Sequence, residues 1–252
     1  MHPVLIDIGP ITVYSYGFFV ATAILLALGI AYREAKQRGL ARHIVPDLGF
    51  YLILSAIVGA RLLYVLFRFD YFAAHPLEIL QFWKGGLVFS GGAVLAIAVG
   101  WFYLRQQNQS FLTWADAFAP GIAAGQAWGR IGCFLAGCCY GQTCYLPWAV
   151  SFESTESLAP THVPLHPTQI YHSLAGVITF VLLLTLGKRL QGKGQAFGLF
   201  LVLYAVFRIG IEFYRASHTA ALLGMSVTQW LSAGLLLAGA AMLARPRRSS
   251  HG

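Results

Sequence analysis

The sequence predicts an all-α, polytopic integral membrane protein with about seven transmembrane helices. Of its 252 residues, 58% are hydrophobic and only 10% are charged, whereas a soluble domain carries about 25% charged residues. The apolar residues gather in runs of about 20, the length at which a helix crosses the hydrocarbon core of a bilayer. An open strand at that depth would leave backbone polar groups unpaired, so each run is expected to be a helix.

Seven apolar runs follow one another, separated by short polar connections. No stretch has the composition of a soluble domain, so we expect a single membrane-embedded domain over residues 1–252. The predicted spans are Val13–Tyr32, Leu48–Phe67, Leu87–Leu104, Phe111–Phe134, Ile170–Gly187, Ala196–Phe213 and Met225–Ala244.

The basic residues predict the orientation of these spans. Eleven of the 17 Lys and Arg residues follow the first, third, fifth and seventh spans: Arg33, Lys36, Arg38, Arg42, Arg105, Lys188, Arg189, Lys193, Arg245, Arg247 and Arg248. Cytoplasmic connections carry the excess of Lys and Arg, so we expect the N-terminus outside and the C-terminus inside. Arg130, Arg208 and the connection Gln142–Pro167 then lie toward the outer leaflet.

The net charge of +8 does not indicate a nucleic-acid-binding protein. The basic residues lie between apolar runs, and no basic face with interleaved aromatic residues exists outside the spans. No nucleic-acid partner is therefore expected, and the partner that the composition does indicate is membrane lipid.

Four polar residues of the sixth span share one helical face. Tyr204, Arg208, Glu212 and Arg215 are spaced by 4, 4 and 3 residues, which brings them together on a helix. One interpretation is an ion-pair ladder of the two arginines and Glu212 that only stabilises packing. The other is a phosphate-binding role for at least one arginine, because the guanidinium fork matches phosphate oxygens.

The stretch Gly125–Tyr145 places Arg130 at the end of a run of small apolar residues and then breaks into glycines and cysteines. A charged side chain at membrane depth is costly and is a functional candidate by default. Asp116, in the same span, is expected near the inner end, where it can cap the start of this helical run.

Two further segments carry polar groups at proposed span ends. In Lys84–Gly92, paired glycines flank Phe89 and Ser90, which allows either a close approach of the backbone to a ligand or tight helix packing. In His166–Tyr171, a proline stands at the start of the fifth span with Gln169 beside it, which suits either a capped helix start or a polar site.

The four cysteines, Cys133, Cys138, Cys139 and Cys144, do not have zinc-finger spacing, and no metal site is expected. On the outer side of a membrane one or two disulfides are expected, with three possible full pairings. The residues alone thus predict a membrane protein with an outward-facing, arginine-lined polar cavity for an anionic lipid head group or another phosphate.

At these residues the sequence resembles the prolipoprotein diacylglyceryl transferase family. The resemblance rests on GRIGCFLAGCCYG (Gly129–Gly141), on Asp116 in ADAFAP, on HPTQIY (His166–Tyr171), on YAVFRIGIEFYR (Tyr204–Arg215) and on SYGFF (Ser15–Phe19). These elements stand in the family's order and cover nearly the whole chain.

The resemblance implies an enzyme of the bacterial cytoplasmic (inner) membrane that acts in lipoprotein biosynthesis. Such an enzyme moves the diacylglyceryl group of phosphatidylglycerol onto the lipobox cysteine of a preprolipoprotein, and it needs no cofactor or metal. The resemblance gives catalytic roles to Arg130, Arg208, Tyr204 and Tyr16. The substrate-binding residues that we expect with it are Arg130, Gly141, Glu212, Arg215, His166, Gln169 and Ser90.

The chain departs from the family's pattern at three positions. Ser90 stands where many members have a histidine, Cys133 where asparagine is common, and His172 where a glutamate usually follows. The proton acceptor is then His166, His172 or an oxygen of the leaving phosphate. The alternative is a divergent paralogue that binds or transports an anionic lipid without transferring it.

Overall fold

The computed structural model describes residues 2–9, 11–217 and 223–245. The chain divides into two compact units, one formed by Met1–Glu34 with Ala115–Gly252 and the other by Ala35–Trp114. Two of the basic residues used to predict orientation, Arg247 and Arg248, lie outside the described residues.

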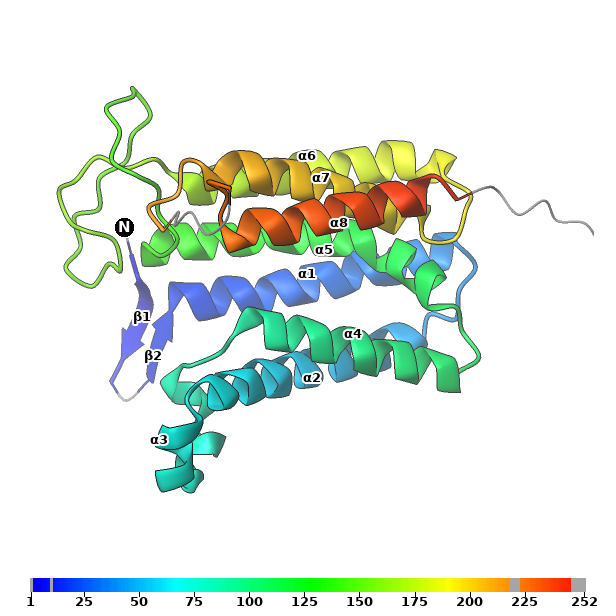
Figure 1. Ribbon diagram of the computed structural model, residues 1–252, viewed down its shortest axis with the longest axis horizontal. Helices are drawn as coiled ribbons and strands as arrows, with labels where there is room; N and C mark the ends of the chain where they lie inside the picture. Colours follow the sequence, from blue (N-terminus) through cyan, green and yellow to red (C-terminus); the bar gives the residue numbers. More distant parts are fainter. Residues whose placement is uncertain (1, 10, 218–222, 246–252) are drawn as a thin grey trace, which may run out of the picture. The chain divides into compact units, whose positions relative to one another are not determined.

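The first unit is a helical bundle with a small hairpin at its N-terminus (Figure 1). The hairpin pairs β1 (Val4–Ile8) with β2 (Ile11–Tyr14) antiparallel. The helices are α1 (Ser15–Gln37), α5 (Phe111–Ala136), α6 (Thr168–Leu186), α7 (Gln195–Glu212) and α8 (Val227–Leu243), with the short 3₁₀ turn η3 (Gly187–Arg189) after α6. Both α1 and α5 begin or end in the other unit.

The core of this unit lies where α5, α6 and α7 meet. Ala119 and Ala123 of α5 are fully buried and pack with Leu183 of α6 and Phe200 of α7. The small residues of α5 let the larger side chains of its neighbours come close to its backbone. Residues of the same three helices also line a common cavity, which contains the polar residues described below.

Asp116 caps a neighbouring helix rather than its own. Its Oδ2 accepts a hydrogen bond from the Gly194 backbone N–H at 2.7 Å, and its Oδ1 accepts one from the Phe197 N–H at 2.8 Å. A carboxylate at a helix start satisfies orphan N–H groups and opposes the positive end of the helix dipole. The sequence predicted a cap at the start of the helix that contains Asp116, and this was wrong, because the carboxylate accepts from the backbone at the start of α7.

Substitution of Asp116 by alanine is expected to lower the free energy of unfolding by about 1–2 kcal/mol, since two amide groups at the start of α7 lose their acceptor. Asp116→Asn keeps one acceptor oxygen and should cost less. Unfolding of the detergent-solubilised protein, followed by circular dichroism, measures both. Equal stability of wild type and Asp116→Ala would contradict the capping role.

The second unit pairs two long helices, α2 (Ile44–Phe67) and α4 (Phe89–Gln106), with α3 (Phe69–Ala74) and the 3₁₀ turns η1 (Pro76–Leu80) and η2 (Phe82–Lys84) between them. The helices cross at Gly59 and Gly91, where a Cβ on Gly91 would lie 2.4 Å from the Gly59 carbonyl oxygen. Tight helix packing thus accounts for this glycine of the segment Lys84–Gly92.

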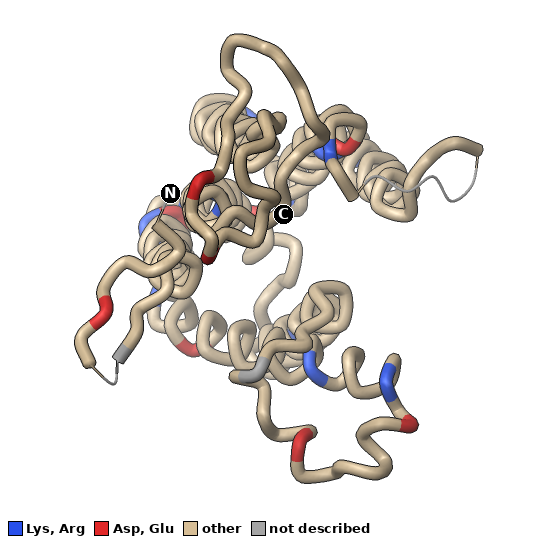
Figure 2. The backbone as a smooth tube through the Cα atoms, turned by 90° about the vertical axis from the view of Figure 1, so that its left-hand side faces the viewer, with Lys and Arg blue, Asp and Glu red and all other residues tan. Residues whose placement is uncertain are grey.

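Each of the seven predicted spans overlaps one long helix of the structure. Within the described residues, four helical stretches are long and apolar enough to cross a membrane: Ser15–Gln37, Ile44–Phe67, Thr168–Arg189 and Gln195–Glu212. Charged residues occupy few positions along the helices (Figure 2). The described chain is therefore mostly helical and of membrane character.

The all-α prediction missed the N-terminal hairpin. Val13, placed in the first span, lies in β2, and α1 begins only at Ser15. The residues Ile11–Tyr14 are β-branched or aromatic and pair with a partner strand before the membrane run begins. The short helical turns between α2 and α4 were not predicted either.

Candidate functional site

A small polar cavity of about 30 Å³ lies in the first unit, between α5, α6 and α7. It is lined by Gln126, Arg130, His172, Ala175, Gly176, Thr179, Phe200, Tyr204, Phe207 and Arg208. Three of the four predicted catalytic residues, Arg130, Tyr204 and Arg208, therefore line one cavity although they are up to 78 positions apart in the sequence.

The Arg208 guanidinium is held on two sides. Its NH1 is 3.0 Å from His172 Nε2 on α6, and its NH2 is 3.2 Å from Glu212 Oε2 one helical turn further along α7. Because a guanidinium can only donate, His172 Nε2 accepts this hydrogen bond and carries no proton. The lone pair of His172 is thus engaged, which weakens its candidacy as the proton acceptor.

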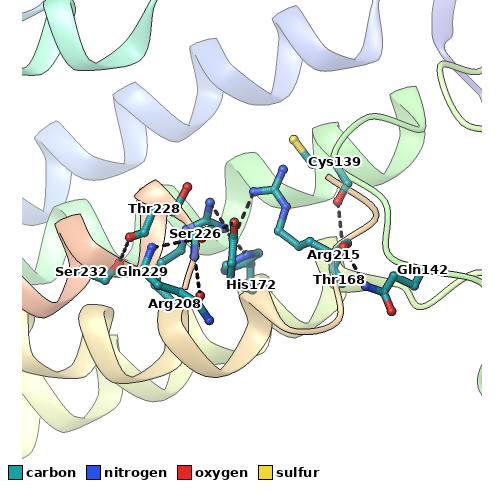
Figure 3. A network of polar contacts seen from close by, with 11 residues as sticks. Cys139, Gln142, Thr168, His172, Arg208, Arg215, Ser226, Thr228, Gln229 and Ser232 are labelled. Carbon is teal, nitrogen blue, oxygen red and sulfur yellow. Dashed lines mark hydrogen bonds and ion pairs between the residues drawn. The ribbon is translucent and has the colours of Figure 1, made fainter. Parts of the chain in front are cut away.

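Glu212 pairs with both Arg208 and Arg215, and these two arginines are labelled in the polar network of Figure 3. It is only 3% exposed and lies between two arginines, with Oε2 at 3.2 Å from Arg208 NH2 and 3.9 Å from Arg215 NH1. The Ser226 hydroxyl donates to its Oε1 at 3.3 Å. One buried carboxylate therefore balances two cations and keeps Arg208 facing the cavity.

Ser226 is itself fixed by the start of α8. Its Oγ accepts from the Gln229 N–H at 3.2 Å, and its own N–H donates to Gln229 Oε1 at 2.9 Å, which forms a capping box. The capping box at the start of α8 thus holds the Ser226 hydroxyl where it donates to Glu212. Sequence analysis missed this contribution, although the Ser-x-x-Gln pattern before an apolar run indicates a capping box.

Arg130 faces the same cavity from α5. Within the described residues its guanidinium has no hydrogen-bonded or ion-paired partner. Its donors are therefore available to a ligand, unlike those of Arg208. Two guanidinium groups thus line one cavity, and that of Arg130 has no partner among the described residues.

The two predicted catalytic tyrosines lie in different surroundings. Tyr204 lines the cavity, and its ring stacks on Phe200 at 6.0 Å between centroids. Tyr16 belongs to the first turn of α1 and is 49% exposed. It adjoins α5 at Gly132, where an added Cβ would lie 3.4 Å from the Tyr16 Cα.

The HPTQIY element braces the loop after α5 rather than the cavity. Thr168 and Gln169 are fully buried, and they donate to the carbonyl oxygens of Cys139 and Cys138, each at 2.7 Å. His166 Nδ1 is 3.1 Å from the Tyr171 hydroxyl. Gln169 and His166 thus hold the backbone next to the site, while the structure puts neither in the lining of the cavity.

Gly141 and Arg215 are brought together by backbone pairing. Gln142 N–H donates to the Tyr214 carbonyl at 2.8 Å, and Gly141 N–H donates to the His166 carbonyl at 3.0 Å. A Cβ at position 141 would lie 2.5 Å from the His166 Cβ. Close packing therefore requires glycine at position 141. The pairing also places the backbone of Arg215 beside Gly141, in the loop that follows α5.

Ser90 belongs to the other compact unit. It is the second residue of α4, and its side chain is exposed there. Its expected part in substrate binding stays a prediction.

The expected disulfides are not found. All four cysteines are among the described residues, and all are free thiols. Cys138 follows the end of α5, and its backbone N–H donates to the Cys133 carbonyl oxygen at 3.1 Å. Hydrogen bonds from Cys133 and Cys138, with the charges of Arg130 and Arg215, lower the pKa of Cys139. Hydrogen bonds with Cys133 and Cys139, together with burial, raise the pKa of Cys138.

Comparison with known proteins adds independent information. A family described as prolipoprotein diacylglyceryl transferase matches residues 3–245. Proteins named phosphatidylglycerol–prolipoprotein diacylglyceryl transferase from Methylibium petroleiphilum and Bordetella avium are 36% and 37% identical, covering 95% and 99% of this chain and 94% and 96% of their own. A protein of the same name from Clostridium tetani is 32% identical, with 95% of each chain covered.

Proposed function

The chain belongs to the prolipoprotein diacylglyceryl transferase family, and on that premise we propose that it transfers the diacylglyceryl group of phosphatidylglycerol to the lipobox cysteine thiol of a preprolipoprotein. The observation that carries the proposal within the molecule is the cavity lined by Arg130, His172, Tyr204 and Arg208. A neutral or cationic substrate would not need two guanidinium groups at one small cavity.

The reaction exchanges one bond for another at a glycerol carbon. The bond from that carbon to the phosphate oxygen breaks, the lipobox sulfur forms a thioether with the carbon, and glycerol-1-phosphate leaves with the bonding electrons. Negative charge therefore grows on the phosphate as the bond breaks. Fixed cations in a site that excludes water stabilise such charge without having to reorganise.

Arg130 and Arg208 supply these cations from different helices, α5 and α7. Arg130 has free donors and binds the incoming head group, while Arg208 is held toward the cavity by His172 and Glu212. Tyr204 donates a hydrogen bond to the bound lipid, and Tyr16 orients it from α1. Arg215 supports the charge balance around Glu212.

The membrane arrangement that goes with this chemistry has seven spans, with the N-terminus outside and the active site toward the outer leaflet of the bacterial inner membrane. The coincidence of seven long helices with seven apolar runs supports it, as does the distribution of Lys and Arg. Phosphatidylglycerol reaches the cavity from the bilayer, and the whole chain acts as one transferase domain.

An assay of the purified protein in detergent tests the proposal. Phosphatidylglycerol labelled with deuterium in its diacylglycerol part is incubated with a lipobox peptide, and peptide mass and free glycerol phosphate are measured. We expect the peptide to gain the labelled diacylglyceryl mass, with one glycerol phosphate released per peptide. Retention of phosphatidylglycerol without either product would instead indicate the lipid-binding paralogue.

Ser90 is not expected to act as the base, because a serine hydroxyl is not a competent base at neutral pH without an activating partner. Ser90→Ala should therefore keep most of the transfer rate in this assay. A loss of more than about 100-fold, the lower range of a general-base contribution, would show that the position takes part in the reaction.

A further inference from the structure

A second cavity lies in the other compact unit, at the end of α2. Its volume is about 330 Å³, within the range of about 300–1,000 Å³ that is typical of ligand pockets. The last turns of α2, the short helix α3, the turns η1 and η2 and the two glycines that follow η2 form its walls. All of its lining residues belong to the unit Ala35–Trp114, and none of them lines the arginine-lined cavity.

One buried-end arginine of α2 fixes the far wall of this second cavity. The Arg61 guanidinium donates to four backbone carbonyl oxygens of the connection after α3, those of Glu78 at 2.6 Å, Ile79 at 2.9 Å, Gly85 at 2.8 Å and Gly86 at 3.2 Å. Most of its donors are therefore already used by the protein. Arg61 holds the loop in place, and the wall is formed before any ligand arrives.

Aromatic rings complete the wall. The Arg61 Cζ lies 5.5 Å from the ring centre of Tyr64 and 5.2 Å from that of Phe72. Gly86 has φ +73°, and a Cβ there would lie 2.4 Å from Tyr64 Cε1. Only glycine lets the loop come this close to the ring, so the sequence is adapted to the shape of the cavity.

Two opposite charges line the cavity without pairing. Arg68 stands at the junction of α2 and α3, where its N–H donates to the Tyr64 carbonyl and its own carbonyl accepts from the Phe72 N–H, each at 3.2 Å. Its guanidinium has no hydrogen-bonded or ion-paired partner in the part of the chain that the structure describes. The Glu78 carboxylate accepts from the Tyr71 hydroxyl at 2.9 Å and forms no ion pair with a described residue.

A third polar group of the lining has an unused atom. Gln81 Oε1 is buried and has no hydrogen-bond partner among the described residues, and an unsatisfied buried acceptor costs free energy. The cavity thus offers a free guanidinium for an anionic group, and Glu78 with Gln81 Oε1 for a group rich in N–H donors. The ring faces of Tyr64 and Tyr71 also attract a cation.

The second cavity lies where a membrane helix ends. Helix α2 has 24 residues, a length of about 36 Å, which exceeds the hydrocarbon core of about 30 Å and brings its last turn to the head groups. The turns η1 and η2 expose large apolar side chains beside the cavity, with Leu77 81%, Leu80 72% and Trp83 70% exposed. Such side chains, tryptophan above all, are typical of the membrane–water interface.

We propose that this second cavity binds the head group of a zwitterionic membrane phospholipid of the phosphoethanolamine class. The phosphate oxygens accept from the Arg68 guanidinium, which suits phosphate, and the ammonium group donates to the Glu78 carboxylate and to Gln81 Oε1. The acyl chains then lie along the exposed apolar side chains of η1 and η2. Binding there needs no transfer reaction, so it does not depend on the proposed transferase function.

Photocrosslinking in lipid nanodiscs tests this site. The full-length protein is placed in phosphatidylcholine nanodiscs with a trace of phosphatidylethanolamine that carries a diazirine on an acyl chain next to its glycerol, and adducts in residues 61–86 are measured by peptide mass spectrometry. Unlabelled phosphatidylethanolamine or phosphatidylglycerol then replaces phosphatidylcholine at constant total lipid. We expect phosphatidylethanolamine to halve the adducts at about a 10-fold lower mole fraction than phosphatidylglycerol, because only its ammonium group makes charged hydrogen bonds to Glu78.

Variants of the two charged residues separate their roles. Arg68→Ala should lower the competed adducts by about 10-fold, and Glu78→Gln should remove the preference for phosphatidylethanolamine. Arg105→Ala and Asp70→Asn make the same charge changes at exposed positions of this unit outside the cavity, and should leave the adducts unchanged.

Three results would overturn the inference. One is equal competition by the two lipids in the wild type, which would mean that the ammonium group is not recognised. Another is a preference that persists in Glu78→Gln or competed adducts that persist in Arg68→Ala. The third is competition by soluble glycerophosphoethanolamine at the same concentration as the lipid, which would show that the ligand is a free phosphoester and not a membrane lipid.

Discussion

Arg208→Ala and Arg130→Ala are each expected to lower the transfer rate by about 10²–10³-fold, the range seen when one fixed donor to a developing anion is removed. Both side chains line the cavity, from α7 and α5. The two substitutions are expected to lower the rate in different ways. Arg130 has free donors and should affect retention of phosphatidylglycerol as well, whereas Arg208 is oriented by His172 and Glu212 and should act mainly on the rate.

Arg189→Ala is the matched control, because this arginine is exposed in η3 of the same unit. Peptide mass and glycerol phosphate release are measured for all three variants after each is shown to insert into the membrane. Arg208→Lys is informative too, since lysine keeps the charge but cannot reach His172 and Glu212 with two separate NH₂ groups. Normal turnover in Arg130→Ala or Arg208→Ala would contradict the phosphate-clamp assignment.

Glu212→Leu is expected to lower the free energy of unfolding by about 3 kcal/mol, because it leaves the largely covered guanidinium groups of Arg208 and Arg215 without their shared buried carboxylate. Removal of one partner of a buried ion pair is far more costly than loss of an exposed pair. Transfer should also be lost, since Arg208 is no longer held toward the cavity.

The stability of the Glu212 variants can be followed by unfolding in mixed detergent micelles. Glu212→Gln keeps the shape and one acceptor oxygen and should be milder than Glu212→Leu, and Glu156→Gln, at an exposed loop position, should leave stability unchanged. An unfolding curve of Glu212→Leu that overlays that of the wild type would show that the carboxylate does not carry the network.

Much of the helical framework was predictable because lipid allows little else. Long apolar runs can only become helices in a bilayer, and each run does overlap a helix. Spacing along one helix was equally informative: Tyr204, Arg208 and Glu212 do share a face, and the two charged residues pair. The ion pairs and the cavity occur together, so the two interpretations of that face were not exclusive.

The spacing of residues along the sequence could not predict which residues of different helices contact one another. The bond from Arg208 to His172 joins α7 to α6, and the hydroxyl that reaches Glu212 comes from the start of α8. Nothing in a single sequence specifies which residues of different helices face each other. The same limit explains why the hydrogen bond from Gln169 to the Cys138 carbonyl was not predicted. The expected part of Gln169 in substrate binding stays a prediction.

The predictions for the N-terminal hairpin and for the cysteines were wrong for other reasons. Ile11–Tyr14 has the same apolar composition as the span that follows it, so the boundary between strand and helix was hidden. The cysteines were interpreted from compartment and spacing, which favour disulfides outside the cell. In the described chain all four are free thiols.

The central claim is that the arginine-lined cavity of the first unit binds the head group of phosphatidylglycerol during transfer. Photocrosslinking with phosphatidylglycerol that carries a diazirine on its terminal glycerol tests it directly, with peptide mass spectrometry to locate the adducts. We expect adducts in residues 126–130, 172–179 and 204–208, suppressed by excess unlabelled phosphatidylglycerol. Competed adducts confined to other segments, with none in these three, would contradict the account.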